Sequence, residues 1–276
     1  MPTPPVQRTF LAGLVTLMLA APGAARDFRS YTPSSLLAPG EWEIQTFHNV
    51  YTQTAFFDDN GKRTDSGARA TYYTGLLAVT MGRSGWNPGV DLVLRSVDDG
   101  AFAGGNASRT ALSAVEPRVE LTPFRRYPRL SVETGVRIPL GSDLEGDASR
   151  PFLDWDDPIW NTHIFFDQEL GEQLFAYFEG GTQLRWDRGA SDVQLTTPLK
   201  AILNLIPTER WTLYLPLEVA PDWIGDPRGN YYSQVGLGAK YRPVPAVELE
   251  TLGTVFPFGR NAGAGATLNL GIRIIP

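Results

Sequence analysis

The sequence predicts an all-β protein: a single antiparallel up-and-down transmembrane β-barrel of about 12 strands, preceded by a signal peptide. Three features of the 276-residue chain predict this fold class. Stretches of about ten residues alternate apolar with polar or small side chains, the N-terminus is organised like an export signal, and long connections alternate with short ones. A period of two gives each strand one apolar face, as a membrane-spanning strand requires.

The first residues predict export. Arg8 precedes an apolar stretch at 10–20 that is too short to cross a membrane as a helix, and small residues follow at 21–25. This order is typical of a cleaved signal peptide, so we expect the mature protein in the bacterial outer membrane. The predicted division of the chain is a signal peptide at residues 1–25, an N-terminal periplasmic segment at 26–40 and an outer-membrane barrel at 41–276.

Twelve strands are predicted, an even number, as in single-chain bacterial barrels. They span residues 41–53, 69–81, 90–97, 108–121, 129–140, 160–170, 173–186, 192–205, 211–220, 231–242, 246–257 and 265–275. Prolines lie inside or near the ends of several of them, at Pro117, Pro139, Pro198, Pro216 and Pro257. Because proline cannot donate a ladder hydrogen bond, we expect bulges or strand ends at these positions.

The connections predict the orientation of the barrel. Long connections alternate with short turns, and the long ones hold most of the acidic residues whereas the short ones hold arginines. Long acidic loops are therefore expected on the extracellular side, with both termini on the periplasmic side. The glycine-rich segments at 100–106 and 259–265 are expected to be flexible loops, and Gly180 and Gly181 are expected to mark a bulge or kink within a strand.

The polar face of the strands supplies the candidate functional residues. If the apolar face meets lipid, charged residues of the opposite parity point inward; a soluble sandwich or barrel would reverse this and look the same in sequence. Trp and Tyr near the strand ends favour lipid. The predicted lumen-lining residues are Glu133, Arg137, His163, Asp167, Glu179, Arg185, Lys200, Glu218, Lys240, Glu250 and Arg273.

Few residues suggest catalysis or metal binding. The chain has no cysteine, which excludes thiol chemistry, and its net charge of −6 argues against nucleic-acid binding. Neither His48 nor His163 has the serine or the ligand spacing of a known catalytic or zinc motif. No catalytic, cofactor-binding or metal-binding residue is predicted, and no enzyme is expected. The acidic run at 154–157 suits calcium, although a solvated acidic loop explains it more simply.

One short motif resembles a known family. The segment GVRIPLGSD at 135–143 resembles the strand-end motif Gly-Val-Lys-x-Pro-Thr-Gly-Asp of outer-membrane barrels similar to the meta-pathway phenol-degradation family. It departs from that motif at Leu140, where threonine is usual, and at Ser142, which precedes the aspartate. The resemblance implies an outer-membrane barrel tied to the uptake of small, hydrophobic compounds, and it carries over no functional residue.

The sequence therefore leaves three functions in view. The first is a channel or transporter for small molecules, hydrophobic or aromatic ones among them, without a cofactor. The second is a closed barrel with a structural or surface-interaction role, because ion pairs can fill a narrow lumen. The third is an outer-membrane lipid hydrolase. The expected partners are outer-membrane lipid and an unidentified small solute.

Overall fold

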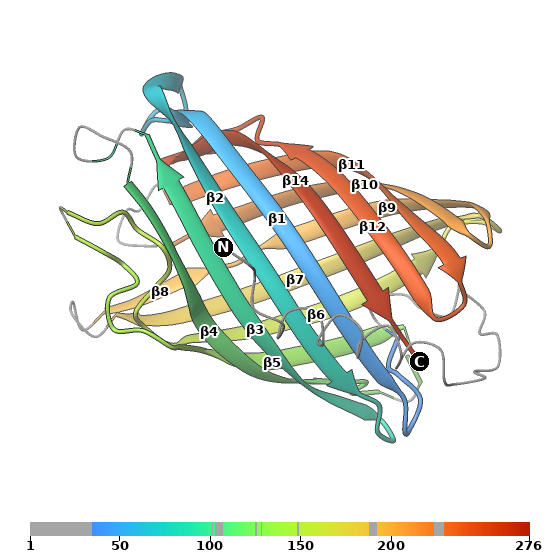
Figure 1. The fold of residues 1–276 in the computed structure, drawn as a ribbon. Helices are drawn as coiled ribbons and strands as arrows, with labels where there is room; N and C mark the ends of the chain where they lie inside the picture. Colours follow the sequence, from blue (N-terminus) through green and yellow to red (C-terminus); the bar gives the residue numbers. More distant parts are fainter. Residues whose placement is uncertain are drawn as a thin grey trace, which may run out of the picture.

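The chain folds into a closed antiparallel β-barrel (Figure 1). The structure is a computed structural model, and it describes residues 35–100, 102, 107–124, 126–127, 129–147, 149–187, 192–223 and 229–276. The strands are β1 (Trp42–Phe57), β2 (Arg63–Met81), β3 (Trp86–Asp99), β4 (Ala107–Leu121), β5 (Leu130–Pro139), β6 (Ile159–Glu169), β7 (Leu174–Asp187), β8 (Asp192–Thr196), β9 (Leu199–Thr208), β10 (Trp211–Asp222), β11 (Asn230–Val244), β12 (Val247–Val255), β13 (Gly259–Arg260) and β14 (Ala262–Ile274).

Strands that follow one another in the sequence lie side by side in the barrel, and β14 pairs with β1 to close it. β8 and β9 together occupy one position between β7 and β10, and the two-residue β13 is an extra pairing on β11. The described strands thus form a barrel of 12 positions with two additional short strands. The predicted fold class and strand number are confirmed.

Several strands extend further than predicted. β1 and β2 continue as a paired ribbon to Phe57 and Arg63, so the connection expected at 55–68 shrinks to residues 58–62. The segment at 259–265, expected to be a flexible loop, instead forms β13 and the start of β14. Its small residues lack the side-chain alternation on which the strand prediction depended, and the segment is ordered by pairing with β1 and β11.

The prolines lie where the ladder is interrupted, as predicted. Pro198 separates β8 from β9, Pro139 is the last residue of β5, and Pro257 follows β12. Pro117 and Pro216 lie inside strands, and there the pairing with one neighbour skips the proline: β4 with β5, and β10 with β11. A strand can hold proline where the missing N–H group faces a gap in the ladder.

The predicted signal peptide and most of the predicted periplasmic segment fall outside the described residues, which begin at 35. The last residues before β1 lie at the end of the barrel that carries the short turns, where the backbone N–H of Gly40 donates to the carbonyl of Gly82 at 3.0 Å. The described residues contain no helix that is long and apolar enough to span a membrane.

Candidate functional site

The structure shows which face of the strands forms the outside of the barrel and which faces its interior. Along β10, the exposed side chains are apolar, with Leu217 51% exposed, whereas the side chain of its neighbour Glu218 is only 15% exposed. The same contrast repeats along the other strands, so the apolar face is the outside of the barrel. A soluble barrel would bury its apolar face, and this arrangement excludes that alternative.

Aromatic side chains lie on the outside near both ends of the strands. Trp160 and Trp186 stack at the end with the long loops, with ring centroids 6.4 Å apart. Trp211 and Tyr241 pack at the opposite end with centroids 4.6 Å apart. Aromatic belts of this kind match the two membrane–water interfaces, with an apolar band between them.

All eleven predicted lumen-lining residues lie on the inner face, opposite the exposed apolar residues of their strands. Ten of them take part in ion pairs, and Asp167 is buried on that face. Whether they line a permeation path remains a prediction. The structure groups nine of them into three networks, and Arg185 pairs with Glu145 of the connection between β5 and β6.

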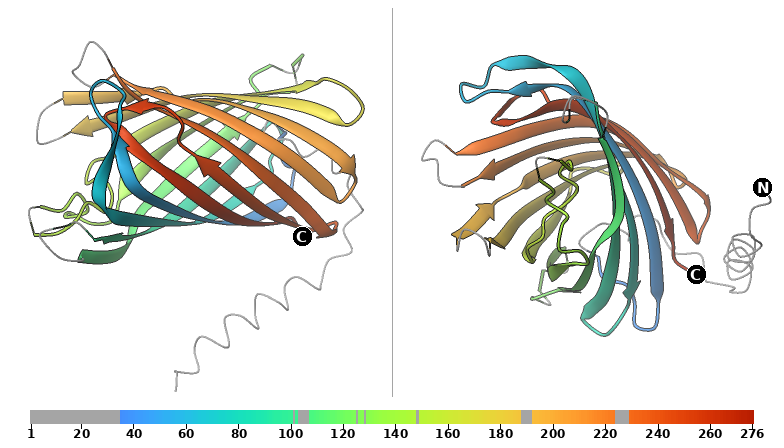
Figure 2. Two further views of the ribbon diagram at one scale, coloured as in Figure 1. Left: turned by 90° about the horizontal axis from the view of Figure 1, so that it is seen from above. Right: turned by 60° about the vertical axis from the view of Figure 1, so that its left-hand side comes forward.

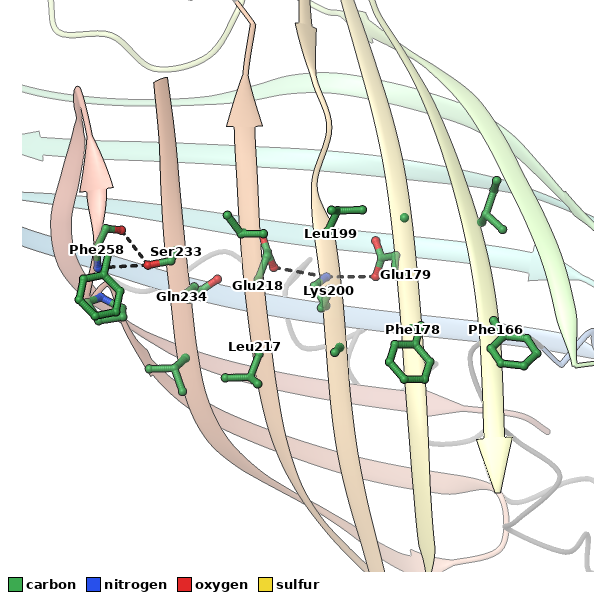
Figure 3. Close-up of a pocket in the computed structure, with 16 residues that line it drawn as sticks. Phe166, Phe178, Glu179, Leu199, Lys200, Leu217, Glu218, Ser233, Gln234 and Phe258 are labelled. Atoms are coloured by element: carbon green, nitrogen blue, oxygen red, sulfur yellow. Dashed lines mark hydrogen bonds and ion pairs between the residues drawn. The ribbon is translucent and has the colours of Figure 1, made fainter. Parts of the chain in front are cut away.

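The first network crosses five strands, from β6 to β11. Lys200 Nζ on β9 lies 3.1 Å from Glu179 Oε2 on β7 and 3.6 Å from Glu218 Oε2 on β10 (Figure 3). The three residues are direct cross-strand partners, which is why their side chains meet. His163 on β6 extends the chain to Glu179 Oε1 at 2.9 Å, and the hydroxyl of Tyr232 donates to Glu218 at 2.8 Å.

The second network links β1, β11, β12 and β14. Lys240 Nζ lies 3.6 Å from both Glu248 and Glu250. Arg273 pairs with Glu248 at 3.4 Å and reaches Glu43 at 4.0 Å. A carboxylate therefore separates each cation from the next, so the positive charges are neutralised locally.

The third network lies across β2 to β5. Arg118 donates to Asp91 at 3.0 Å, to Glu133 at 2.6 Å and to Thr80 at 2.8 Å. Arg137 donates to Glu116 at 3.0 Å. Asp91, Glu116 and Arg118 also belong to the charged parity that the sequence predicts to face inward. The alternation of β4 alone does not fix the side of Glu116 and Arg118, because a β-bulge opposite Val93 and Leu94 shifts it.

An aromatic row on the inner face was not predicted. Tyr72 stacks on Tyr51 with centroids 5.9 Å apart, and Phe256 meets Tyr51 edge-on at 5.3 Å and Tyr232 at 5.6 Å. A Cβ atom at Gly265 would lie 2.6 Å from the Tyr51 ring, so this glycine makes room for the row. Tyrosine is common on either face of a barrel strand, so the sequence pattern does not reveal the row.

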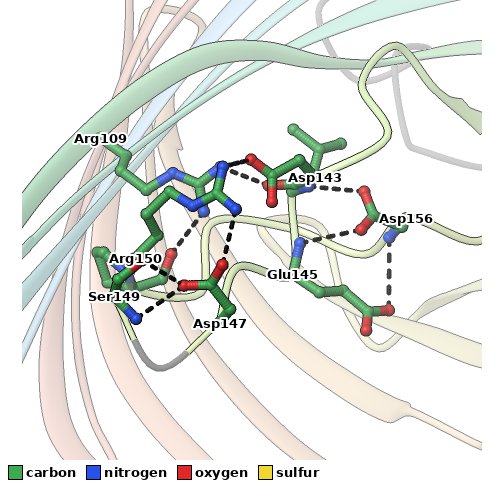
Figure 4. A network of polar contacts seen from close by, with 9 residues as sticks. Arg109, Asp143, Glu145, Asp147, Ser149, Arg150 and Asp156 are labelled. Carbon is green, nitrogen blue, oxygen red and sulfur yellow. Dashed lines mark hydrogen bonds and ion pairs between the residues drawn. The ribbon is translucent and has the colours of Figure 1, made fainter.

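The longest connection, at 140–158 between β5 and β6, has its own polar structure (Figure 4). Arg150 binds Asp143 and donates to Asp147 Oδ2 at 2.7 Å. The hydrogen bond from Arg150 and those from the hydroxyl and backbone N–H of Ser149 hold the pKa of Asp147 well below its usual range. Arg109 of β4 ties the connection to the wall by donating to the carbonyls of Asp143 at 2.5 Å and Pro151 at 2.8 Å.

The acidic run in this connection is engaged by protein groups. Asp154 is 4% exposed and accepts a hydrogen bond from Ser113 at 2.7 Å, and Asp156 accepts the backbone N–H of Leu144 at 2.6 Å. The simpler explanation of this run as a solvated acidic loop is therefore wrong for Asp154 and Asp157, which are buried. Within the described ranges, no group of three or more His, Cys, Asp or Glu side chains is placed to hold a metal ion.

A groove of about 900 Å³ runs along the outer face of β6, β7 and β9 to β11 (Figure 3). Phe166, Phe178 and Phe258 contribute aromatic rings to its lining. The small residues Gly180 and Ala201 also line it, and their short side chains leave the groove open. Its surface is almost wholly apolar, so it suits hydrocarbon better than water. The Glu218–Lys200–Glu179 network lies on the other side of the same strands.

Each histidine contacts a side chain on a neighbouring strand of the barrel. His48 Nδ1 lies 2.7 Å from the hydroxyl of Tyr73 on the outer face, and His163 Nδ1 contacts Glu179. Both contacts are consistent with structural roles. The expectation that the protein is not an enzyme stays a prediction.

No known protein-family model and no curated protein sequence matches the chain. Several solved structures do match the chain in fold. An outer-membrane channel from Pseudomonas putida F1 aligns with a TM-score of 0.73 and 14% identity over 89% of this chain and 99% of its own. The β domain of the Bordetella autotransporter BrkA aligns with a TM-score of 0.60 and 14% identity over 86% and 99%. The chain therefore has the fold of an outer-membrane β-barrel.

Proposed function

We propose that this protein is an outer-membrane channel that admits small molecules, with hydrophobic or aromatic compounds as its substrate class. One observation carries the proposal: a closed barrel of 12 strand positions presents an apolar outside and an inside lined by charged, hydroxyl and aromatic side chains. A barrel built in this way is suited to conduct solutes through its interior. The eleven predicted inner residues would line the path, and residues 1–25 would direct export.

Two observations support the substrate class. The aromatic row of Tyr72, Tyr51, Phe256 and Tyr232 gives the inner wall an apolar strip beside the ion-pair networks. The motif at 135–143 resembles that of the phenol-degradation barrels, which are tied to small hydrophobic compounds. Aromatic faces contribute stacking and apolar contact to a ring-shaped solute that a purely charged wall would reject.

Conductance and solute flux test the proposal. In planar bilayers we expect current steps of uniform size. In vesicles that contain the barrel, we expect the flux in excess of that in protein-free vesicles to be larger for phenol than for a sugar of similar size. Heat-modified migration in detergent gels checks that the protein tested is a folded barrel. A folded barrel that gives no steps and admits neither solute over a wide voltage range would contradict a channel.

The same measurement addresses the closed-barrel alternative. The ion pairs favour it, because Lys200, Lys240 and Arg118 are each held between two carboxylates on the inner face. Paired charges of this kind can fill a narrow lumen as well as line a path. Absence of flux for every solute would favour this structural role.

A further inference from the structure

The connection at 140–158 folds against the inner wall of the barrel. In the right-hand view of Figure 2 this yellow-green segment lies within the curve of the wall. Leu144 and Leu153 form a buried cluster with Val97 of β3, and Tyr72 and Ala111 pack against that cluster. The three wall residues belong to the inner face of β2, β3 and β4, so the loop rests inside the bore at the end with the long loops.

A buried carboxylate attaches the loop on this side. Asp154 accepts a hydrogen bond from the hydroxyl of Ser113 at 2.7 Å and lies 3.4 Å from Arg95 Nε. Ser113 lies where the pairing of β3 with β4 shifts register, so the bulge turns its hydroxyl toward the loop. A buried aspartate is stable only when it is paired and hydrogen-bonded in this way.

An aromatic pair attaches the loop on the other side. The guanidinium carbon of Arg185, on the inner face of β7, lies 3.2 Å from the centre of the Trp155 ring. Glu145 of the loop pairs with the same arginine at 3.4 Å, and Phe152 meets Trp155 edge-on with centroids 4.8 Å apart. The Arg185 side chain is 8% exposed, so the ring and the carboxylate cover its charge, whereas Phe152 and Trp155 are themselves exposed.

We propose that this segment is the constriction of the barrel, and that Phe152 and Trp155 select for uncharged, apolar solutes at it. The proposal rests on the channel function proposed above. The loop attaches to β2, β3 and β4 on one side and to β7 on the other. It therefore narrows the bore along the half of the circumference that runs from β2 to β7. Asp154 and Arg185, the charged groups through which the loop is attached, are each neutralised by a partner, and the side chains of Phe152 and Trp155 remain exposed to a passing solute.

A double variant, Ser113→Cys with Asp154→Cys, tests the position of the loop. The natural chain has no cysteine, so the only possible disulfide joins loop to wall. We expect the pair to cross-link under mild oxidation in the folded barrel. The oxidised form should conduct like the natural protein. A variant in which a short glycine-serine linker replaces residues 144–153 should conduct at least twofold more than the natural protein, because it lacks the part of the loop that narrows the bore. Heat-modified migration confirms that both variants are folded.

The outcomes separate this inference from the proposed function. Failure to cross-link would overturn the inward position of the loop. Cross-linking together with a linker variant that conducts no more than the natural protein would overturn the constriction while leaving the channel. A cross-linked barrel that does not conduct, together with silence from the linker variant, would overturn the channel and its constriction together.

Trp155→Ala tests selectivity, with Trp86→Ala as the matched control on the outer face. Each flux is taken in excess of that in protein-free vesicles, and we expect Trp155→Ala to reduce at least threefold the ratio of phenol flux to benzoate flux and Trp86→Ala to leave this ratio unchanged. An unchanged ratio in folded Trp155→Ala barrels would overturn the selective role of this ring.

Discussion

Gly181 of β7 packs directly against Pro198, the residue that separates β8 from β9. The backbone N–H of Gly181 donates to the carbonyl of Pro198 at 2.7 Å, and a Cβ atom at 181 would lie 2.8 Å from Pro198 Cγ and 3.1 Å from His163 Nδ1. The single hydrogen bond bridges the gap in the ladder, because regular pairing of β7 stops at Gly180 and resumes at Gln183. The expected kink at the glycine pair is thus a close approach of two backbones.

Gly181→Ala should therefore destabilise the barrel by about 1–3 kcal/mol, the usual cost of forcing a methyl group into a packed site. Gly180→Ala is the matched control, since a Cβ atom there would make only an ordinary contact of 3.7 Å with Leu199. Urea unfolding from lipid vesicles measures both. Equal stability of the two variants would contradict the close-approach argument.

Lys200→Met should destabilise the barrel by about 1–3 kcal/mol, between the values for exposed and buried ion pairs. The change leaves Glu179 and Glu218 without the cation between them. Adding Glu218→Gln should recover part of the loss, because it removes one of the two repelling charges. Arg129→Ala, which removes the exposed pair with Glu169, should cost less than about 1 kcal/mol. A loss for Arg129→Ala as large as that for Lys200→Met would count against the network.

Arginine should be tolerated on the inner face and not on the outer. Leu203→Arg places a charge on the exposed apolar face of β9 and should cost about 2–4 kcal/mol in a bilayer. Asn204→Arg, one residue further on the inner face, should cost less than half as much. Unfolding from vesicles compares the two, and a reversed order would contradict the assignment of the faces.

The hairpin at 147–150 should weaken only in strong acid. Its hydrogen bonds hold the pKa of Asp147 below the ordinary value, so their stabilisation is complete above the unfolded pKa and is lost as pH falls through the folded one, below about pH 4. Asp143 and Arg109 also face Arg150 or its loop. The protection of the Ser149 amide against hydrogen exchange measures the effect, and Asp147→Asn should remove the pH dependence. Loss of protection already near pH 6 would contradict this cause.

The strand positions could be predicted because each strand carries its own evidence. Leu213, Leu215 and Leu217 alternate with polar or small neighbours, and no other part of the chain is needed to recognise them. The segment at 259–265 escaped prediction because glycine and alanine carry no such pattern, and only pairing with β1 and β11 shows it to be a strand.

The ion-pair and hydrogen-bond partners of these side chains could not be predicted in the same way. Lys200 meets Glu179 and Glu218 because of the register of three strands, and register depends on hydrogen bonds between segments that alternation does not align. The inward path of 140–158 depends on Ser113 and Arg185, which lie far from the loop in sequence. The acidic composition of this loop favours exposure to solvent, but the pairing of its carboxylates with buried cations and hydroxyl groups outweighs that preference.

The sequence by itself determined a barrel of 12 strands, the interruptions at its prolines and the set of residues that share a face, since all three follow from local periodicity and backbone chemistry. Only the tertiary structure decided that the apolar face is outside, which charges pair, and that the longest loop lies inside the bore. Closure through β1 and β14 is the physical reason, because it gives the sheet an inside and brings distant residues together there.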